Sequence, residues 1–382
     1  MKPHARPRYL GATVREDLQK KMVFIAGPRQ VGKTTLALSL LGTSDESHPG
    51  YLNWDDPHTR PALLRGEIPS GQPLLVLDEI HKFRRWRSLL KGLYDTHRST
   101  VRFLVTGSAR LDVYRKGGES LQGRYHHYRL HPFSLRELAA DPRAQDVEHL
   151  LRFGGFPEPA LSGEERTWRR WNRERLDRVV HQDIRDLENV RDLGLIELLA
   201  EELPNRVGSP LSVGSLKNLL QVAHETVERW LAILEAMYLC FRIPPYGAPR
   251  IRAVRKERKL YLYDWSQVPD AGARFENLVA SQLLKYCHFE EDREGHRMEL
   301  RYLRDTDKRE VDFVVLRNRK PLFAVECKTG PKAVSPAARY FRSRTDIPRY
   351  YQVHLGDRDF GDAENDVRVL PFLHFCSELE MP

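Results

Sequence analysis

The sequence predicts an α/β protein of several domains that begins with a parallel sheet. Its length of 382 residues is roughly two to four times that of an ordinary domain. Apolar, strand-like runs alternate with helical patterns up to about residue 130, after which Arg-rich, Trp-containing helical segments follow. Alternating strands and helices indicate a mainly parallel sheet that is covered on both faces.

The first domain is expected to span residues 1–140. Its opening strand is the apolar run 22–27, MVFIAG, and the pattern that follows has helical spacing and ends at a glycine. Further strands are predicted at 50–53, 74–77 and 101–105, with helical sequence between the last two. A strand, a loop and a helix therefore follow one another at the start of the sheet.

Three further domains are expected after residue 140. Residues 141–205 are predicted to form a helical lid or connector that is interrupted by the turn-forming run 153–161. In residues 206–265 two helical patterns flank a short turn and a β-like segment follows, which is the order of a winged helix. Residues 266–382 give one amphipathic helix and several strands, and this order favours a small α/β domain.

Composition limits the classes of function. The chain has 62 Lys and Arg against 53 Asp and Glu, a formal charge of +9, which favours phosphate-bearing partners and DNA first among them. No run approaches the roughly 20 apolar residues of a membrane span, and the N-terminus lacks the apolar core of a signal peptide, so a cytoplasmic location is expected. The four cysteines are widely spaced and predict neither a zinc site nor disulfides.

A phosphate-binding motif follows the first predicted strand. Residues 27–34, GPRQVGKT, match GxxxxGK[ST] at every required position between a strand and a helix. The glycines let backbone N–H groups close around phosphates, Lys33 reaches the terminal phosphates, and the Thr34 hydroxyl ligates Mg²⁺. The predicted ATP-binding residues are Gly27, Pro28, Arg29, Gln30, Val31, Gly32, Lys33, Thr34 and Thr35.

Two acids follow the third predicted strand. The apolar run 74–77 leads directly into Asp78 and Glu79. The end of a strand would place Asp78 beside the metal ion and Glu79 where it can polarise an attacking water. An acidic pair at a strand end is weak evidence alone, but its position after the phosphate-binding motif favours this function.

Two further groups are candidates for contacts with the γ-phosphate. Ser108 ends the next strand and is predicted to sense the phosphate; the alternative is that the segment is only a strand-ending turn. Hydrolysis also needs a positive charge at the phosphoryl group, often an arginine from a neighbouring subunit. Arg110, Arg115 and Arg124 are candidates; Arg124 is preferred, and the alternative is that all three are solvated surface residues.

A basic segment follows the predicted helix-turn-helix. Between residues 242 and 259 basic residues meet a single acid, Glu257, and aromatic residues flank them. Such density favours a wing or strand along a phosphate backbone, although a solvated basic hairpin is the alternative. The predicted DNA contacts are Arg242, Arg250, Arg252, Arg255, Lys256, Arg258 and Lys259.

The C-terminal strands carry an acid and lysine constellation. Asp312 lies in one predicted strand, and Glu326 and Lys328 lie two residues apart on the same face of the next. Carboxylates of this kind can hold Mg²⁺ while the lysine orients water or stabilises the developing charge, as in phosphodiester hydrolysis. Glu276 on the preceding helix is the expected third acid, and whether this site cuts DNA or only binds it stays open.

Together these motifs resemble a known group, the prokaryotic AAA+ ATPases that join a P-loop domain to a C-terminal domain of unknown function with a restriction-endonuclease-like core. The resemblance spans nearly the whole chain. It is carried by GPRQVGKTT (27–35), YLNWDDP (51–57), LVLDEIHK (75–82), TGSARL (106–111), GGFPE (154–158), FENLVASQLL (275–284), EVDFVV (310–315) and AVECKTG (324–330).

The resemblance implies an AAA+ sheet, a winged helix and a PD-(D/E)XK-type domain in that order. It also implies a homo-oligomer, since AAA+ relatives commonly act as ring oligomers; a hexameric ring is one form, and the number of subunits stays open. Cys327 stands where an apolar residue is usual, which is a mild departure. The expected function is an ATP-dependent, DNA-binding or DNA-remodelling ATPase whose C-terminal domain binds or cleaves DNA. The alternative is an ATP-gated regulatory switch for a protein partner, with an inactive nuclease-like domain.

Overall fold

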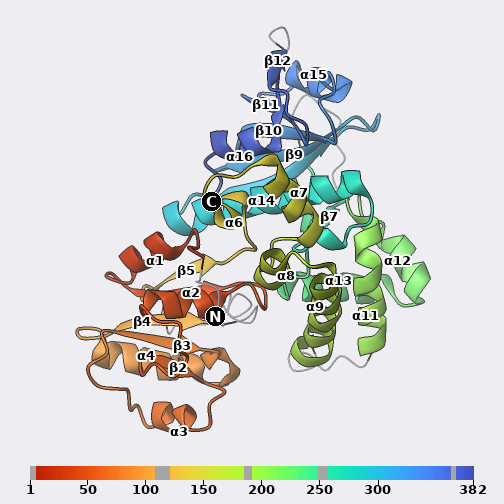
Figure 1. Ribbon diagram of the computed structural model, residues 1–382. Helices are drawn as coiled ribbons and strands as arrows, with labels where there is room; N and C mark the ends of the chain where they lie inside the picture. The colour runs from red at the N-terminus through yellow and green to blue at the C-terminus, as the bar shows by residue number, and fades with distance from the viewer. Residues whose placement is uncertain (1–5, 108–120, 185–191, 248–256, 363–366) are drawn as a thin grey trace. The chain divides into compact units, whose positions relative to one another are not determined.

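The computed structural model describes residues 6–107, 121–184, 192–247, 257–362 and 367–382 (Figure 1). The chain divides into two compact units, residues 1–131 and residues 132–382. Within the described residues, no helix is both long enough and apolar enough to cross a membrane.

The first unit is built on a sheet of five parallel strands in the order β2-β3-β4-β1-β5. This parallel α/β sheet confirms the predicted class, and four of its strands coincide with the predicted runs. The fifth, β5, was not predicted from the sequence. The elements are α1 (Gly11–Asp17), β1 (Met22–Ala26), α2 (Lys33–Leu40), β2 (Tyr51–Asn53), α3 (Thr59–Leu64), β3 (Leu74–Asp78), the 3-10 turn η1 (Ile80–Lys82), α4 (Trp86–His97), β4 (Arg102–Thr106) and β5 (Tyr125–Arg129).

Both faces of this sheet are covered. Phe24, Leu77 and Phe103 point to one face and form a buried core with Leu90 of α4. Helix α2 contacts β3 and β4, and α1 contacts β1. Because the strands are parallel, the carboxyl ends of β1, β3 and β4 meet at one edge of the sheet, where ligands bind in folds of this type.

The second unit begins with helices. These are α6 (Leu135–Leu138), α7 (Ala144–Phe153), α8 (Pro157–Ser162), α9 (Glu165–Arg178), the π-helical segment η4 (Val179–Ile184), α11 (Leu193–Glu202) and the 3-10 turn η5 (Leu203–Arg206). The run 153–161, predicted as a turn, instead contains most of α8. Pro157 starts this helix because its fixed φ suits the first turn, and Gly163, at φ 64°, ends it.

Two helices and two strands follow. Helix α12 (Val213–Leu220) and helix α13 (His224–Ala236) are separated by a short turn, and β6 (Cys240–Ile243) pairs antiparallel with β7 (Lys259–Leu262). Buried apolar residues of both helices, among them Leu216 and Trp230, form the packed face. The order of elements is the one predicted for a helix-turn-helix followed by strands.

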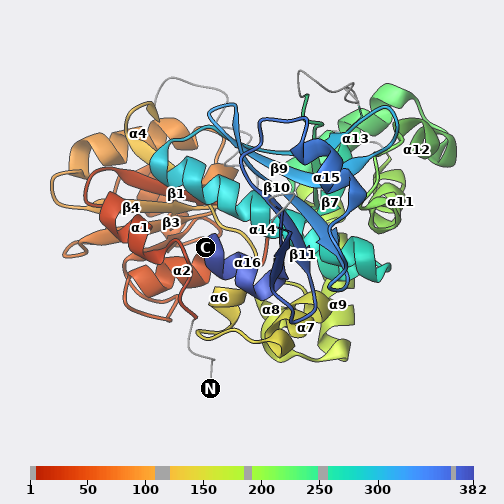
Figure 2. The same ribbon diagram turned by 90° about the horizontal axis from the view of Figure 1, so that it is seen from above.

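The C-terminal part is one long helix against a six-stranded sheet of order β12-β13-β11-β10-β9-β8. Strands β8, β9 and β10 are antiparallel, whereas β10, β11 and β13 are parallel. Helix α14 contacts β8, β9 and β10 and lies lengthwise along them (Figure 2). The elements are η6 (Trp265–Gln267), α14 (Ala271–Glu294), β8 (Met298–Arg304), β9 (Glu310–Arg317), β10 (Lys320–Lys328), α15 (Pro336–Arg342), β11 (Tyr350–His354), β12 (Phe360–Asp362), β13 (Val367–Pro371) and α16 (Phe372–Glu378).

Candidate nucleotide site and C-terminal carboxylate cluster

The loop between β1 and α2 has the backbone geometry of a phosphate cradle. Gly27 has φ 149° and Gly32, at the N-terminus of α2, has φ 95°, so both occupy conformations that favour glycine. A Cβ at Gly27 would lie 2.3 Å from the carbonyl oxygen of Leu130. Lys33 donates hydrogen bonds to the carbonyls of Gly27 and Pro28 at 3.0 and 2.7 Å, so its ammonium group already lies over the loop.

The remaining loop residues complete the turn. Gln30 has φ 60°, and the Val31 side chain is fully buried while its carbonyl accepts a 2.6 Å hydrogen bond from Arg8. Arg29 is partly exposed in the loop, and Thr35 is exposed in the first turn of α2. The helix N-terminus and the loop N–H groups favour an anion at this position.

Asp78 is the point at which three strands and α2 meet. It ends β3, and its carboxylate accepts hydrogen bonds from the hydroxyls of Thr34 at 2.9 Å, Tyr51 at 2.7 Å and Thr106 at 2.6 Å. Burial and the Asp78 charge together raise the pKa of Tyr51, so its hydroxyl stays protonated and donating. These bonds place the Asp78 carboxylate beside the Thr34 hydroxyl.

Glu79 follows Asp78 in a left-handed conformation, φ 57°. Its side chain is 22% exposed, and Nζ of Lys82 and Nε2 of His81 each lie 3.6 Å from its Oε2. Burial and the adjacent Asp78 charge raise the pKa of Glu79, and the charge of Lys33 opposes that shift. A carboxylate with a raised pKa is a stronger base, which suits the activation of water.

The residues of the first unit fit ATP and Mg²⁺. Thr34 and Asp78 supply adjacent oxygen ligands of the kind Mg²⁺ prefers, and Lys33 supplies a cation above the loop. When bound, Mg²⁺ would neutralise phosphate charge at this position.

The γ-phosphate candidates have different outcomes. Ser108, Arg110 and Arg115 lie outside the described residues. Arg124 donates to both carboxylate oxygens of Asp95 at 2.9 and 3.2 Å, and this bond raises the pKa of the arginine. Strand β4, which comes before these candidates in the chain, ends at Thr106, and the Thr106 hydroxyl donates a hydrogen bond to Asp78.

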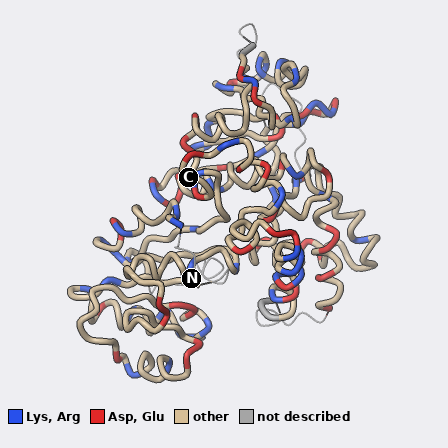
Figure 3. The backbone as a smooth tube through the Cα atoms, in the orientation of Figure 1, with Lys and Arg blue, Asp and Glu red and all other residues tan. Residues whose placement is uncertain are grey.

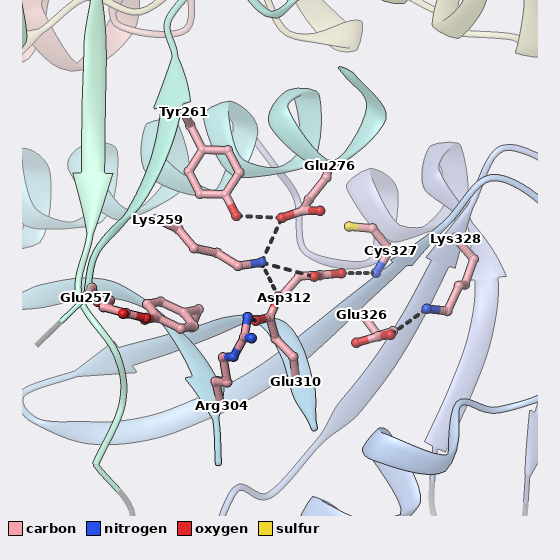
Figure 4. Close-up of polar contacts among 11 residues, drawn as sticks. Glu257, Lys259, Tyr261, Glu276, Arg304, Glu310, Asp312, Glu326, Cys327 and Lys328 are labelled. Carbon is pink, nitrogen blue, oxygen red and sulfur yellow. Dashed lines mark hydrogen bonds and ion pairs between the residues drawn. The ribbon is translucent and has the colours of Figure 1, made fainter. Parts of the chain in front are cut away.

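In the second unit, acids and cations from five elements gather in one cluster (Figure 4). Asp312 on β9 accepts the backbone N–H of Cys327 at 2.8 Å. On β10, Nζ of Lys328 contacts Oε1 of Glu326 at 2.6 Å, while Oε2 of Glu326 is buried without a hydrogen-bond partner among the described residues. Glu276 on α14 accepts a 2.6 Å hydrogen bond from the hydroxyl of Tyr261 on β7. The predicted residues are therefore brought together.

The centre of this cluster is a lysine. Nζ of Lys259, on β7, lies 3.0 Å from Glu276, 2.5 Å from Glu310 and 3.5 Å from Asp312. The Lys259 side chain is fully buried, and the charges of Glu276, Asp312 and Glu310 raise its pKa against the opposing effect of burial. Its ammonium group is therefore charged at neutral pH.

Two acids of the cluster, Glu276 and Glu326, have raised pKa values and so resist ionisation. Burial, followed by the charge of Asp312, raises the pKa of Glu276 to about 7 and that of Glu326 to about 8. Lys259 and Lys328 oppose these shifts. Carboxylates this close to one another need a nearby cation if all are to be charged.

A divalent ion held by Glu276, Asp312 and Glu326 does not fit this arrangement. Both oxygens of Asp312 already have partners: one contacts Lys259, and the other accepts the N–H of Cys327. One oxygen of Glu326 contacts Lys328. Within the part of the chain that the structure describes, no group of three or more His, Cys, Asp or Glu residues is arranged to hold a metal ion.

Two of the predicted DNA contacts must be corrected. The Arg242 side chain is 6% exposed and contacts Glu228 and Glu235 at 2.7 and 2.9 Å, and Lys259 is buried in the carboxylate cluster. Neither side chain can reach a phosphate backbone from these positions. Arg258 is exposed. The others, Arg250, Arg252, Arg255 and Lys256, lie outside the described residues.

Sequence reasoning missed three residues of these sites, namely Tyr51, Tyr261 and Glu310. Glu310 and Asp312 are two residues apart on β9, and Lys259 and Tyr261 are two apart on β7, so each pair shares one face of its strand. That alternation was available in the sequence. The contact between β7 and the C-terminal cluster could not be predicted from the sequence.

Comparison with known proteins agrees with the first unit. Residues 19–139 match a family model described as an AAA domain, and residues 144–269 and 271–375 match two domains of unknown function, DUF8612 and DUF4143. The parallel sheet and the phosphate-binding loop agree with the first match, so the N-terminal region resembles a P-loop domain of the AAA class.

Proteins that are similar over most of the chain have low sequence identity to it. The chain is 24% identical over 334 residues to the uncharacterized protein MJ1637 of Methanocaldococcus jannaschii, covering 71% of this chain and 69% of that protein. The Thermotoga maritima RuvB Holliday junction branch migration motor is 19% identical with a TM-score of 0.31, covering 61% of this chain and 87% of that chain. The Aeropyrum pernix Orc1 protein, solved in complex with DNA, is 16% identical with a TM-score of 0.35, covering 74% and 96%.

Proposed function

We propose that the protein is an ATP-hydrolysing AAA+ ATPase that uses ATP and Mg²⁺ to act on DNA in the cytoplasm. The observation that carries the proposal is the meeting of Lys33, Thr34, Asp78 and Glu79 at the carboxyl ends of β1 and β3. A cation, a hydroxyl–carboxylate pair and a base of raised pKa are the groups that ATP hydrolysis requires of a protein.

Each group has a separate role in the proposed reaction. Lys33 exchanges the carbonyls of Gly27 and Pro28 for phosphate oxygens, and Thr34 and Asp78 hold the metal ion. Glu79 accepts a proton from the attacking water. Arg124 is proposed to act on the nucleotide of a neighbouring subunit in a homo-oligomer, after releasing Asp95.

Lys33→Ala is expected to weaken ATP binding by about tenfold or more, because the variant loses the cation that pairs with the terminal phosphates. The measurement is calorimetric titration of the full chain with ATP and Mg²⁺. Lys91→Ala, a change in α4 away from the loop, serves as the control. Equal affinities of Lys33→Ala and the unmodified protein would refute the proposed nucleotide site.

Helix α9 supports the DNA part of the proposal. Arginines recur along this helix (Figure 3). Arg166, Arg170 and Arg173 are exposed, and the spacing of four and three residues puts them on one face. Among the described residues none of these three takes part in an ion pair, whereas Arg169 and Arg178 on the same helix contact Glu165 and Glu174. A row of arginines without acidic partners is suited to phosphate contacts.

Replacing Arg166, Arg170 and Arg173 together by Gln is expected to weaken DNA binding at every sequence tested. If each arginine contacts one phosphate, the slope of log affinity against log salt should fall by about three. Fluorescence anisotropy with duplex DNA over a range of salt concentrations measures both effects. The matched control is Arg169→Gln with Arg178→Gln, which removes arginines whose charges are already paired. An unchanged slope in the triple variant would exclude α9 from the DNA interface.

The deciding experiment is ATP turnover by the purified protein with Mg²⁺, with and without duplex, single-stranded and branched DNA. Stimulation by one of these DNAs supports a DNA-acting ATPase and identifies the preferred form. If DNA neither binds nor stimulates turnover, the DNA proposal fails and an ATP-gated switch for a protein partner replaces it.

A further inference from the structure

The C-terminal carboxylate cluster holds a cation that belongs to the chain itself. We infer that the Lys259 ammonium group occupies the place of a divalent ion in this cluster. The second unit then binds no divalent ion there and does not hydrolyse phosphodiesters in this conformation. The inference depends on neither ATP hydrolysis nor DNA binding.

The contacts of Lys259 come from three directions. Glu276 reaches it from α14, and Glu310 and Asp312 reach it from β9, so the ammonium group lies between the helix and the sheet (Figure 4). The Tyr302 ring on β8 lies 5.7 Å from Nζ and adds an aromatic face. A lysine has three N–H donors, and here three carboxylates are available to accept them.

Backbone pairing keeps Lys259 in this position. Its strand pairs with β6 opposite Ile243 on one side, and Lys259 forms an isolated bridge with Pro210 on the other. The N–H of Leu211 also donates to the carbonyl of Arg258 at 2.8 Å. Because the backbone is held on both sides and the side chain is fully buried, the ammonium group cannot turn to solvent without moving β7.

The charges of the cluster nearly balance without a metal ion. Four carboxylates, those of Glu276, Glu310, Asp312 and Glu326, lie among three cations, those of Lys259, Arg304 and Lys328. Four minus three leaves one negative charge when every group is ionised, and protonation of either Glu276 or Glu326, whose pKa values burial raises to about 7 and about 8, removes that charge. A divalent ion between Glu276 and Asp312 would lie close to the Lys259 ammonium group, and repulsion between buried like charges is strong.

Lys259 also comes from a different part of the chain than the acids. It lies in the segment that matches DUF8612, whereas all four carboxylates lie in the segment that matches DUF4143. The cluster therefore joins the two segments through buried ion pairs. Removing a partner from such a group leaves uncompensated buried charge, which is strongly destabilising.

The test measures Mn²⁺ binding by the full, nucleotide-free chain. Electron paramagnetic resonance of the free ion gives the amount bound. The Mn²⁺ bound at the cluster is the fraction of bound ion that is lost in Asp312→Asn. Mn²⁺ bound at Asp78 is not affected by that change, so the two sites can be distinguished. The unmodified protein is expected to bind no Mn²⁺ at the cluster. Lys259→Met, of similar length and uncharged, is expected to bind Mn²⁺ at the cluster at least about tenfold more tightly than the cluster of the unmodified protein does. Mn²⁺ should also raise the melting temperature of Lys259→Met by more than it raises that of the unmodified protein.

Lys285→Met is the matched control. Lys285 is also buried in the second unit, where it contacts Glu137, so this change removes a buried ammonium group without opening the cluster. It should be destabilised and gain no Mn²⁺ site. Mn²⁺ binding by the unmodified protein that is lost in Asp312→Asn overturns the inference. If Lys259→Met does not fold, the comparison of the unmodified protein with Asp312→Asn still decides it, because binding at the cluster would refute the inference.

Discussion

Glu79→Gln is expected to bind ATP and to hydrolyse it about 10² to 10³ times more slowly than the unmodified protein. Glutamine keeps the size of the side chain and the contact with solvent but cannot accept a proton. The groups that hold the nucleotide, Lys33, Thr34 and Asp78, are unchanged, so affinity should change little. Steady-state phosphate release and equilibrium ATP binding, measured on the same preparation, separate the two effects.

A neighbouring acid provides the control for this prediction. Glu67 is in the same unit, is exposed and contacts Arg65 at 2.8 Å, so Glu67→Gln should leave turnover unchanged. Loss of ATP binding in Glu79→Gln would show that the residue supports the loop and is not the base. Retained turnover would mean that another group activates the water.

The nucleotide site was predictable because its signals are local. A glycine-rich loop between a strand and a helix can be identified from residues 27–34 alone, and Asp78 follows from a strand that ends in acids. The hydrogen bonds of Tyr51 and Thr106 to Asp78 were not predictable, because they depend on the order β2-β3-β4. Strand order is a long-range property that alternation of apolar and polar residues does not contain.

The C-terminal cluster shows the opposite case. Sequence spacing correctly grouped Asp312, Glu326 and Lys328, because β9 and β10 are neighbouring strands of one hairpin. It assigned Lys259 to DNA because the segment around it is rich in basic residues. In the structure Lys259 is buried, since β7 brings it against α14 and β9. A basic run can thus contain both exposed residues such as Arg258 and a structural cation.

Arg242 was also assigned to DNA and is also paired with acids, which here lie closer in the sequence. Its guanidinium group contacts Glu228 and Glu235, both on α13, fourteen and seven residues earlier in the chain, respectively. The two acids are seven residues apart and so lie on one face of the helix. Counting acids only within the strand segment missed them. Local charge density is therefore a poor guide to exposure where a helix packs against the same strand.

Gly27→Ala is expected to destabilise the first unit by several kcal/mol and to abolish tight ATP binding. Two effects add. The backbone at φ 149° disfavours any side chain, and the new Cβ would lie 2.3 Å from the carbonyl oxygen of Leu130, which is backbone and cannot move aside cheaply. The N–H of Leu130 bonds to the carbonyl of Ala26 at 2.8 Å, so separating the two segments would also break the pairing that holds the loop at the sheet edge.

Gly42→Ala separates these two effects. Gly42 has φ 78°, and a Cβ there would meet no atom within 4 Å, so this variant carries backbone strain without a clash. Its stability loss should be about 1 kcal/mol, with ATP affinity unchanged. Urea unfolding and ATP titration of both variants give the comparison. If Gly27→Ala loses no more stability than Gly42→Ala and still binds ATP, the loop is free to move away from Leu130. The close approach would then not be what shapes the phosphate cradle.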